Sequence, residues 1–173
     1  LRADYPHGLQ ETREDNFGIA LFSKLPTDKS DIVYLGEAEV PSVTAVVQFM
    51  GKTLKILGTH PIPPSGAENS QLRNQQLKSL PLLLSDWQGP VVLLGDLNTT
   101  PWSPHFRKLL RDSGLTDSAR GFGWQTTWPA GLLPLRIAID HCLVSRDLRV
   151  IARQVGPNIG SDHLPLLVEI AVE

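Results

Sequence analysis

Short apolar runs, separated by glycine, proline and polar residues, dominate the pattern along this chain. Runs of this kind with β-branched or alternating composition predict strands at 18–24, 32–39, 42–49, 53–59, 91–95, 137–145, 148–155 and 164–172. Gly51-Lys52 lies between the third and fourth runs and predicts a tight turn joining two antiparallel strands. Residues 1–16 are polar and irregular, and the pattern predicts a loop there.

Helical spacing occurs in two places. Between Ala67 and Trp87, leucines recur every three or four residues, which predicts a long helix. Pro81 within it is expected to kink or restart the helix. A second, shorter helix is predicted from Ser103 to about Asp112. Two arginines of the strand at 148–155, Arg149 and Arg153, are expected to be solvated.

The most continuous aliphatic run, Val91 to Leu94, is typical of a strand buried on both faces. Asp96 stands where this run stops, and Asn98 follows two residues later. Residues i and i+2 of an extended chain point to the same side. A carboxylate and an amide therefore project together from the end of a core strand, which is where α/β proteins place chemistry. The same residue types also favour helix caps and turns, so this segment alone leaves both interpretations open.

Two later segments carry further polar groups next to apolar runs. Asp140 lies inside the predicted strand at 137–145, and a buried carboxylate needs a partner because an unpaired charge is costly there. Gly160-Ser161-Asp162-His163 leads directly into the last predicted strand. Each segment is a weak signal when it is taken alone.

Taken in order, GDLN at 95–98, IDHCLVS at 139–145 and GSDHLP at 160–165 resemble the endonuclease/exonuclease/phosphatase superfamily. This superfamily includes pancreatic-type deoxyribonuclease, abasic-site endonucleases, sphingomyelinases and inositol-polyphosphate phosphatases. The resemblance extends from about Phe17 to Val172. It implies an α/β (α+β) fold, a four-layer sandwich of two mixed, mostly antiparallel sheets packed face to face with helices outside. Residues 1–173 are expected to form one such domain.

The resemblance also implies the roles of individual residues. Asp96 would orient and deprotonate an attacking water, and Asn98 would hold that water or donate to a phosphoryl oxygen. His163 would contact the phosphate as a cation, which Asp140 favours by bonding the other ring nitrogen. His60, at the end of the strand at 53–59, would add charge stabilisation, although a strand-end histidine can also simply bond a nearby carbonyl.

A divalent metal, Mg²⁺ or Mn²⁺, is implied in the same way, with Asp162, Asp96 and Asn98 as candidate ligands. The principal ligand of the superfamily is a glutamate in a Gln-Glu pair that ends an early apolar strand. Leu9-Gln10-Glu11 has these letters, but the preceding Pro6 and Gly8 do not suit the interior of a buried strand. We therefore expect the true glutamate and the first two strands to precede Leu1. The chain alone is then expected to bind metal weakly, to be weakly active or inactive, and to expose sheet edges that favour a homodimer.

Composition narrows the choice of partners only slightly. The net charge of −2 gives no electrostatic footprint for non-specific nucleic-acid binding, so the phosphate-ester substrate stays either a nucleic acid or a phospholipid head group. Cys142 is the only cysteine and is predicted to be a small core residue. No apolar run is long enough to span a membrane. The THPIPP and GDLNTTPWS sequences resemble a bacterial branch in which membrane helices precede the domain, so the parent protein is expected to be membrane-attached.

Two questions stay open at this level. Trp102, Trp124 and Trp128 either grip a base, sugar or acyl chain, or pack a loop over the edge of the sandwich. Asn16 is either a turn residue or faces the site. The predicted function is that of a metal-dependent phosphoesterase, most directly a phosphodiesterase. The alternative is a non-catalytic binding or scaffold domain, but that reading expects one of the motif residues to be lost, and none is.

Overall fold

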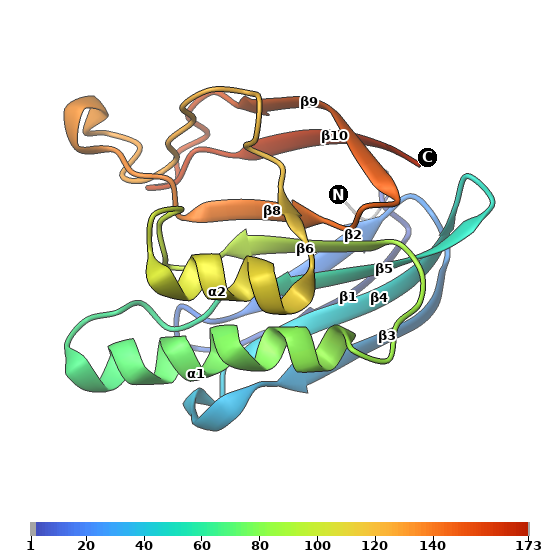
Figure 1. The fold of residues 1–173 in the computed structure, drawn as a ribbon, viewed down its shortest axis with the longest axis horizontal. Helices are drawn as coiled ribbons and strands as arrows, with labels where there is room; N and C mark the ends of the chain where they lie inside the picture. Colours follow the sequence, from blue (N-terminus) through green and yellow to red (C-terminus); the bar gives the residue numbers. More distant parts are fainter. Residues whose placement is uncertain (1–2, 173) are drawn as a thin grey trace.

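A computed structural model describes residues 3–172 and is built around one six-stranded sheet (Figure 1). The strand order is β3-β4-β5-β6-β8-β7, and every neighbouring pair is antiparallel except β5 and β6. The strands are β3 (Thr27–Tyr34), β4 (Pro41–Phe49), β5 (Lys52–Thr59), β6 (Val91–Asp96), β7 (Thr116–Asp117) and β8 (Asp140–Val144). Helices α1 (Ala67–Leu84) and α2 (Pro104–Ser113) cover one face of this sheet.

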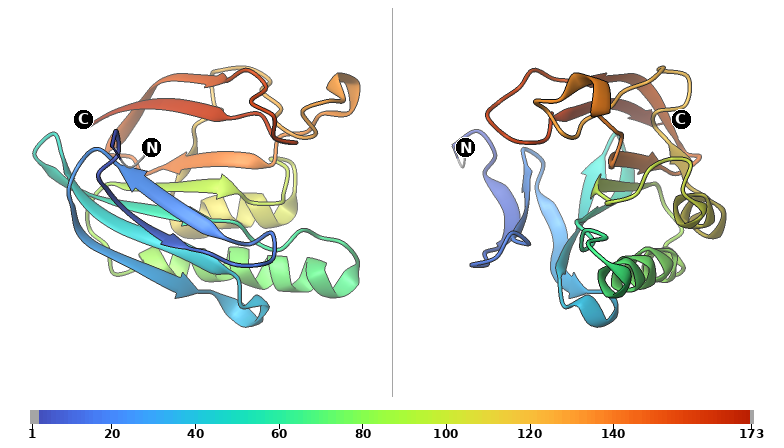
Figure 2. Two further views of the ribbon diagram at one scale, coloured as in Figure 1. Left: turned by 180° about the vertical axis from the view of Figure 1, so that it is seen from behind. Right: turned by 90° about the vertical axis from the view of Figure 1, so that its left-hand side faces the viewer.

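Two separate antiparallel hairpins form a second layer on the other face (Figure 2). One pairs β1 (His7–Glu11) with β2 (Ile19–Ser23), and the other pairs β9 (Leu148–Val155) with β10 (Leu166–Val172). The first hairpin lies over β3, β4 and β5, whereas β10 lies over β8. Within the described residues, β2 and β10 each pair with one strand only, so each keeps an open edge above the middle of the large sheet.

The α+β class and the face-to-face arrangement of sheets are therefore confirmed. The structure adds two particulars: the second layer is divided into two hairpins, and within residues 3–172 both α-helices lie on the six-stranded sheet. Neither of these helices combines the length and the apolar character that a bilayer-crossing segment requires.

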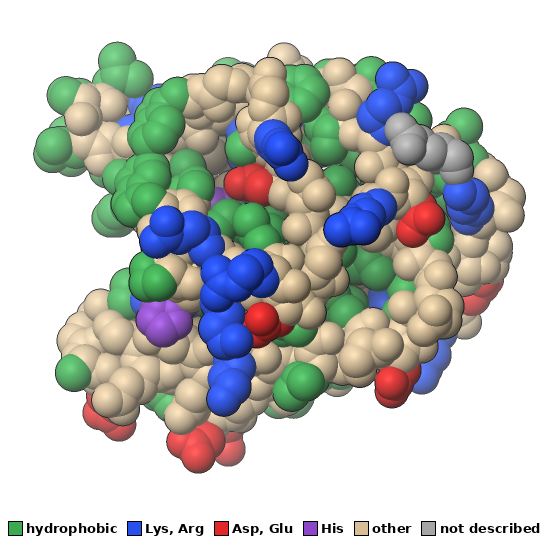
Figure 3. Space-filling view, in the orientation of Figure 1, with side chains coloured by type: hydrophobic (Ala, Val, Ile, Leu, Met, Phe, Trp, Pro, Cys, Tyr) green, Lys and Arg blue, Asp and Glu red, His purple; other side chains and the backbone are tan. Residues whose placement is uncertain are grey.

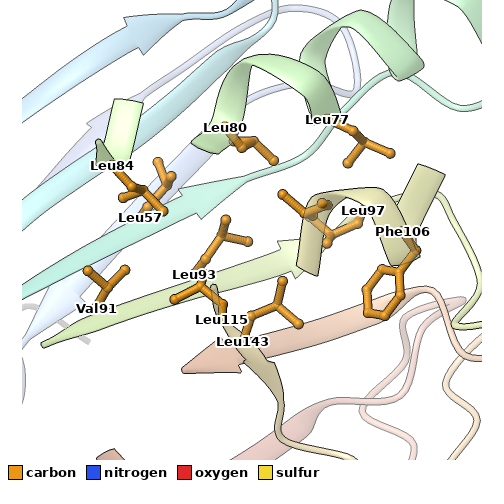
Figure 4. Close-up of a cluster of buried hydrophobic side chains, with 11 residues drawn as sticks. Leu57, Leu77, Leu80, Leu84, Val91, Leu93, Leu97, Phe106, Leu115 and Leu143 are labelled. Carbon is orange, nitrogen blue, oxygen red and sulfur yellow. The ribbon is translucent and has the colours of Figure 1, made fainter. Parts of the chain in front are cut away.

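The main core fills the space between the six-stranded sheet and the two helices (Figure 4). Alternate residues of β6 and β8 point into it, because successive side chains of a strand face opposite sides. Leucines and one phenylalanine dominate this core: Leu57, Leu77, Leu80, Leu84, Leu93, Leu97, Phe106, Leu109 and Leu143. Leu77, Leu80 and Leu84 lie on both sides of Pro81 in sequence, and their burial explains why α1 continues through the proline to Leu84.

The prediction of a loop over residues 1–16 is wrong for His7–Glu11, which form β1. Half-buried and exposed residues alternate along this strand, and each residue pairs with one in β2. Gly8 lies so close to the partner that an added Cβ would be 2.3 Å from the carbonyl oxygen of Leu21. The strand lies in an exposed hairpin rather than in the middle of a sheet, which is why a preceding proline is tolerated.

Two other predictions need correction. The strand expected at 32–39 is β3, at 27–34, and it is followed by the 3₁₀ turn η1 (Gly36–Ala38). Its exposed polar residues, such as Asp28 and Asp31, hid this edge strand from the apolar pattern. Arg153 is buried rather than solvated; it donates hydrogen bonds to the Ser118 hydroxyl and to the side-chain carbonyl of Gln125.

Candidate active site

Three neighbouring strands have their ends close together at one end of the six-stranded sheet. Strands β5 and β6 are parallel and end there, and β8 begins there because it is antiparallel to β6. His60 follows the end of β5, and Asp96 at the end of β6 is paired in register with Asp140 at the start of β8. His163 comes from the loop between β9 and β10. Residues that are far apart in sequence are thus brought to one place.

The side chains of these residues form a connected row. His163 Nδ1 lies 2.8 Å from Asp140 Oδ2, a hydrogen-bonding distance. His163 Nε2 lies 3.7 Å from Asp96 Oδ2, and His60 Nε2 lies 3.6 Å from the same oxygen. Asp96 Oδ2 therefore faces two imidazole rings, one of which is bonded to a second carboxylate.

The turn after β6 fixes Asn98. Its backbone N–H donates to Asp96 Oδ1 (2.8 Å), and its side-chain amide donates to the Pro61 carbonyl (2.9 Å). The Arg73 guanidinium donates to the Asn98 carbonyl oxygen. Asn98 has φ 48°, a left-handed conformation that asparagine adopts more readily than most residues. Arg73 thus holds the turn after β6 in place, and it also lines the pocket.

Two further residues, Gly95 and His141, hold this end of the sheet together. An added Cβ at Gly95 would lie 1.9 Å from the Thr59 carbonyl oxygen, so glycine permits the close approach of β6 to the end of β5. His141 is buried on the helix side, packs on Phe106 with ring centroids 4.3 Å apart, and has Nε2 2.8 Å from the Thr99 carbonyl oxygen. The sequence signal for the burial of His141 is the alternation of side chains along a strand. Because Asp140 points to the pocket, the next residue must point to the opposite, apolar face of the sheet.

A pocket of about 1010 Å³ opens over the row, and its lining includes His60, Asp96, Asn98, Asp162 and His163. Asn16 also lines it while it lies in a turn, so both interpretations of this residue agree with the structure. Trp128 forms part of the wall; its indole N–H lies 3.4 Å from Asp162 Oδ2, and its ring centroid lies 6.3 Å from that of His163.

The environment separates the protonation behaviour of the central groups. Burial, followed by the charge of Asp140, raises the pKa of Asp96 to about 6, against the opposing effect of the Asn98 N–H bond. Burial lowers the pKa of His163, but the hydrogen bond to Asp140 and the surrounding carboxylates outweigh it, so the pKa is raised. Burial and the neighbouring His163 lower the pKa of His60. The two imidazoles are thus biased in opposite directions, with His163 towards the cation and His60 towards the neutral form.

The donor atoms at the site fit a hard divalent cation only in part. Asp96, Asp140 and His163 each offer a ligand atom within 4.8 Å of the others, but His163 and Asp140 are bonded to each other. The carboxylates of Asp162 and Asp96 and the Asn98 amide also bring oxygen atoms to the pocket, and these suit Mg²⁺ or Mn²⁺ chemically.

Glu11 and Cys142 do not belong to this donor set. Glu11 is absent from the lining of the pocket, and its carboxylate accepts a hydrogen bond from the Tyr34 hydroxyl at 3.3 Å. Cys142 is buried, as the sequence predicted, and burial raises the pKa of its thiol to about 11. Its thiolate form is therefore disfavoured, which argues against a nucleophilic role.

Comparison with known proteins gives a consistent picture of the fold. A model described as the Endonuclease/Exonuclease/phosphatase family matches residues 2–163. The endonuclease/exonuclease/phosphatase from Bacteroides vulgatus has a TM-score of 0.80 at 18% identity, over 99% of this chain and 78% of that one. The human Nocturnin catalytic domain with bound sulfate has a TM-score of 0.77 at 20% identity, over 99% and 74%.

A humanized TDP2 of D. rerio has a TM-score of 0.75 at 15% identity, over 98% of this chain and 78% of that one. The TM-scores show a shared fold at these low identities, and each neighbour has additional residues without a counterpart here. The search of curated proteins gave no match.

Proposed function

The chain belongs to the endonuclease/exonuclease/phosphatase family, and we propose that its site hydrolyses phosphate esters, most directly phosphodiesters, with Mg²⁺ or Mn²⁺. The observation that carries this proposal is the row in which Asp96 Oδ2 lies between His60 and His163, with Asp140 bonded behind His163. A base between two N–H donors, in a pocket with further oxygen ligands, suits attack by water on a phosphoryl group.

In this proposal each residue acts on a stated atom. Asp96 Oδ2 accepts a proton from the water whose oxygen bonds to phosphorus, and a pKa of about 6 suits a base at neutral pH. His163 Nε2–H, as part of a cation favoured by Asp140, donates to a non-bridging phosphoryl oxygen. His60 offers a second donor, and Asn98 orients the water or the phosphoryl oxygen. The ester oxygen leaves with the bonding electron pair and finally takes a proton, so one water is consumed for each ester cleaved.

The metal would be held by Asp162, Asp96 and the Asn98 oxygen, and when bound it neutralises charge on the phosphoryl oxygens. This set contains only two carboxylates, because Asp140 is hydrogen-bonded to His163 and is not part of it. We therefore propose that this chain by itself binds Mg²⁺ weakly. Calorimetric titration with Mg²⁺ and Mn²⁺ is the measurement, and micromolar binding would contradict the proposed ligand shortage.

The preference for diesters rests on the shape of the pocket. Trp128, Ile137 and Ile139 add apolar surface to a pocket far larger than one phosphate group, which leaves room for a second ester substituent. The substrate class is either a nucleic acid or a phospholipid head group.

The test of hydrolysis uses bis-p-nitrophenyl phosphate, nucleic acid and phospholipid with high Mg²⁺ or Mn²⁺. Asp96→Asn and His163→Ala should abolish whatever activity the chain has, whereas Asp31→Asn and His105→Ala, at exposed positions outside the pocket, should leave it intact.

A second readout does not depend on turnover. Titration with dimethyl phosphate should move the imidazole NMR signals of His60 and His163 but not those of His105. If no substrate is cleaved and these signals stay fixed, the scaffold interpretation replaces the enzymatic one.

We also propose that the open edges of β2 and β10 pair with another chain, giving a homodimer. Unpaired edges are ready templates for strand addition. The groove beside β10, about 310 Å³, is lined by Val92, Leu94, Cys142, Leu166, Val168 and Ile170 among others, so covering it would bury apolar surface.

A further inference from the structure

A projecting loop next to the pocket is apolar and exposed. Residues 129–136, with the short 3₁₀ turn η2 (Leu133–Leu135), stand out from the body of the molecule at the left of Figure 1. Leu132, Leu133 and Leu135 on this loop are 55%, 72% and 69% exposed. One exposed leucine is ordinary on a protein surface, but three on one protruding loop indicate a surface that meets something apolar.

A pair of tryptophans extends this surface towards the body of the protein. Trp102 and Trp124 stack with ring centroids 5.3 Å apart and planes 3° from parallel, yet both stay largely exposed. Trp124 and Leu133 line the same hollow, which joins the pair to the loop. Figure 3 shows hydrophobic side chains gathered at this end of the molecule. We call Trp102, Trp124, Leu132, Leu133 and Leu135 the apolar tip.

The charges near the apolar tip are mainly positive. From Ser118 to Ile139 the sequence contains two charged side chains, Arg120 and Arg136, and no carboxylate. The loop from Gly156 to Ser161 is uncharged and carries Ile159, another exposed residue. Helix α2, which begins two residues after Trp102, carries Arg107, Lys108 and Arg111. Its one carboxylate, Asp112, pairs with Lys108 at 2.7 Å, so Arg107 and Arg111 add net positive charge. An apolar surface flanked by cations complements a lipid bilayer, which combines an apolar interior with anionic head groups.

The apolar tip is held in place and tied to the pocket. Buried Arg153 and half-buried Gln125 hydrogen-bond each other at its base, and Arg136 donates to the Ala130 carbonyl (2.6 Å). The Ala130 N–H donates to the Asp162 carbonyl (2.7 Å), so the loop is anchored directly beside a candidate metal ligand. A surface that is ordered in advance loses little conformational entropy on docking.

We propose that the apolar tip docks on a lipid bilayer, with its leucines and tryptophans at the boundary between head groups and acyl chains. Tryptophan favours this boundary because its ring is apolar and its N–H is polar. A stacking site for nucleic acid would explain the tryptophans but not the three leucines. Docking does not depend on catalysis. The corollary that the substrate is a phosphodiester of the head-group layer rests on the proposed function.

The test is sedimentation of the metal-free chain with large vesicles of phosphatidylcholine and phosphatidylglycerol in equal parts. The double variant Leu132→Ser/Leu133→Ser should bind at least about tenfold more weakly, as expected when two buried leucine side chains are lost from an interface. Leu82→Ser is the matched control, because Leu82 is 73% exposed and Leu133 is 72% exposed, but Leu82 lies near the end of α1. It should bind like the wild type.

Tryptophan fluorescence gives a second readout. Vesicles should shift the emission to shorter wavelength, brominated acyl chains should quench it, and Trp124→Phe should reduce both effects. Three results would overturn the proposal: a wild type that stays in the supernatant, a double variant that sediments like Leu82→Ser, or self-association that is lost in the double variant and explains the exposed surface instead. All these measurements omit metal and record binding rather than hydrolysis, so their failure is separate from any failure of the hydrolysis assay.

Discussion

The two faces of strands β6 and β8 are built from neighbouring residues but have different surroundings. Leu93 and Leu143 point to the helices and are 0% exposed. Leu94, the next residue, points to the second layer and is 40% exposed, because the two hairpins leave the middle of the sheet partly open. Asp96 and Asp140 continue the row of side chains on this open face. The helix face is therefore a finished core, whereas the other face leads from an apolar groove into the candidate active site.

The sharpest way to test this comparison is to truncate the two adjacent leucines of β6. Leu93→Ala should lower the free energy of unfolding by about 2–5 kcal/mol, because it leaves a cavity in a closed core. Leu94→Ala should cost less than about 1 kcal/mol, because water already reaches that side chain. Urea denaturation of the two variants measures the difference, and equal costs would show that the second-layer face is as closed as the helix face.

The second prediction concerns the carboxylate that ends the open-face row. The pKa of Asp96 is raised from 3.8 to about 6, so its contribution to stability is full below pH 3.8 and is lost as the pH rises through about 6. Asp96→Asn removes this loss and keeps an oxygen for the Asn98 N–H. The variant should therefore become more stable than the wild type as the pH rises from 3.8 to about 6. At pH 8 the difference should be about 1–3 kcal/mol. Urea denaturation in the presence of a chelator measures this, and a difference independent of pH would contradict the buried-carboxylate account.

The third prediction concerns the hydrogen bond between His163 and Asp140. Asp140→Asn should lower the pKa of His163, because the variant loses the charged acceptor that stabilises the imidazolium. NMR titration of the metal-free chain follows the ring signals directly. Asp117→Asn, a carboxylate in β7 away from the pocket, is the control and should leave the titration unchanged. An unchanged midpoint in Asp140→Asn would show that the 2.8 Å contact does not set the protonation of His163.

The smallest expected effect concerns the open groove itself. If another chain covers it, sedimentation of the wild type should show a concentration-dependent dimer, and Leu94→Glu should shift the chain to the monomer. Because Leu94 is half exposed, the substitution should change the free energy of unfolding by less than about 1 kcal/mol. Leu82→Glu, on a distant exposed site, should leave the dimer intact. A wild type that is monomeric at all concentrations would contradict the proposed homodimer.

The sequence by itself determined the elements whose signals are local. The strands at β4, β5, β6, β8 and β9, and both helices, follow from apolar periodicity, turn residues and caps, which act between near neighbours in the chain. The same local patterns placed Asp96 and Asn98 at a strand end and His163 before the last strand. Local patterns could not show that these residues meet at one end of the sheet, because that depends on the strand order. The family resemblance supplied that expectation.

The tertiary structure alone decided the features that depend on distant partners. Strand β1 exists because β2 pairs with it, and Arg153 is buried because Ser118 and Gln125 satisfy its guanidinium. His141 is stably buried because Phe106 packs on its ring and the Thr99 carbonyl oxygen lies 2.8 Å from its Nε2. The raised pKa of Asp96 arises from burial, and the exposure of the apolar tip arises from its projection. Desolvation and packing are set by what surrounds a side chain in space, and local sequence specifies those surroundings only in part.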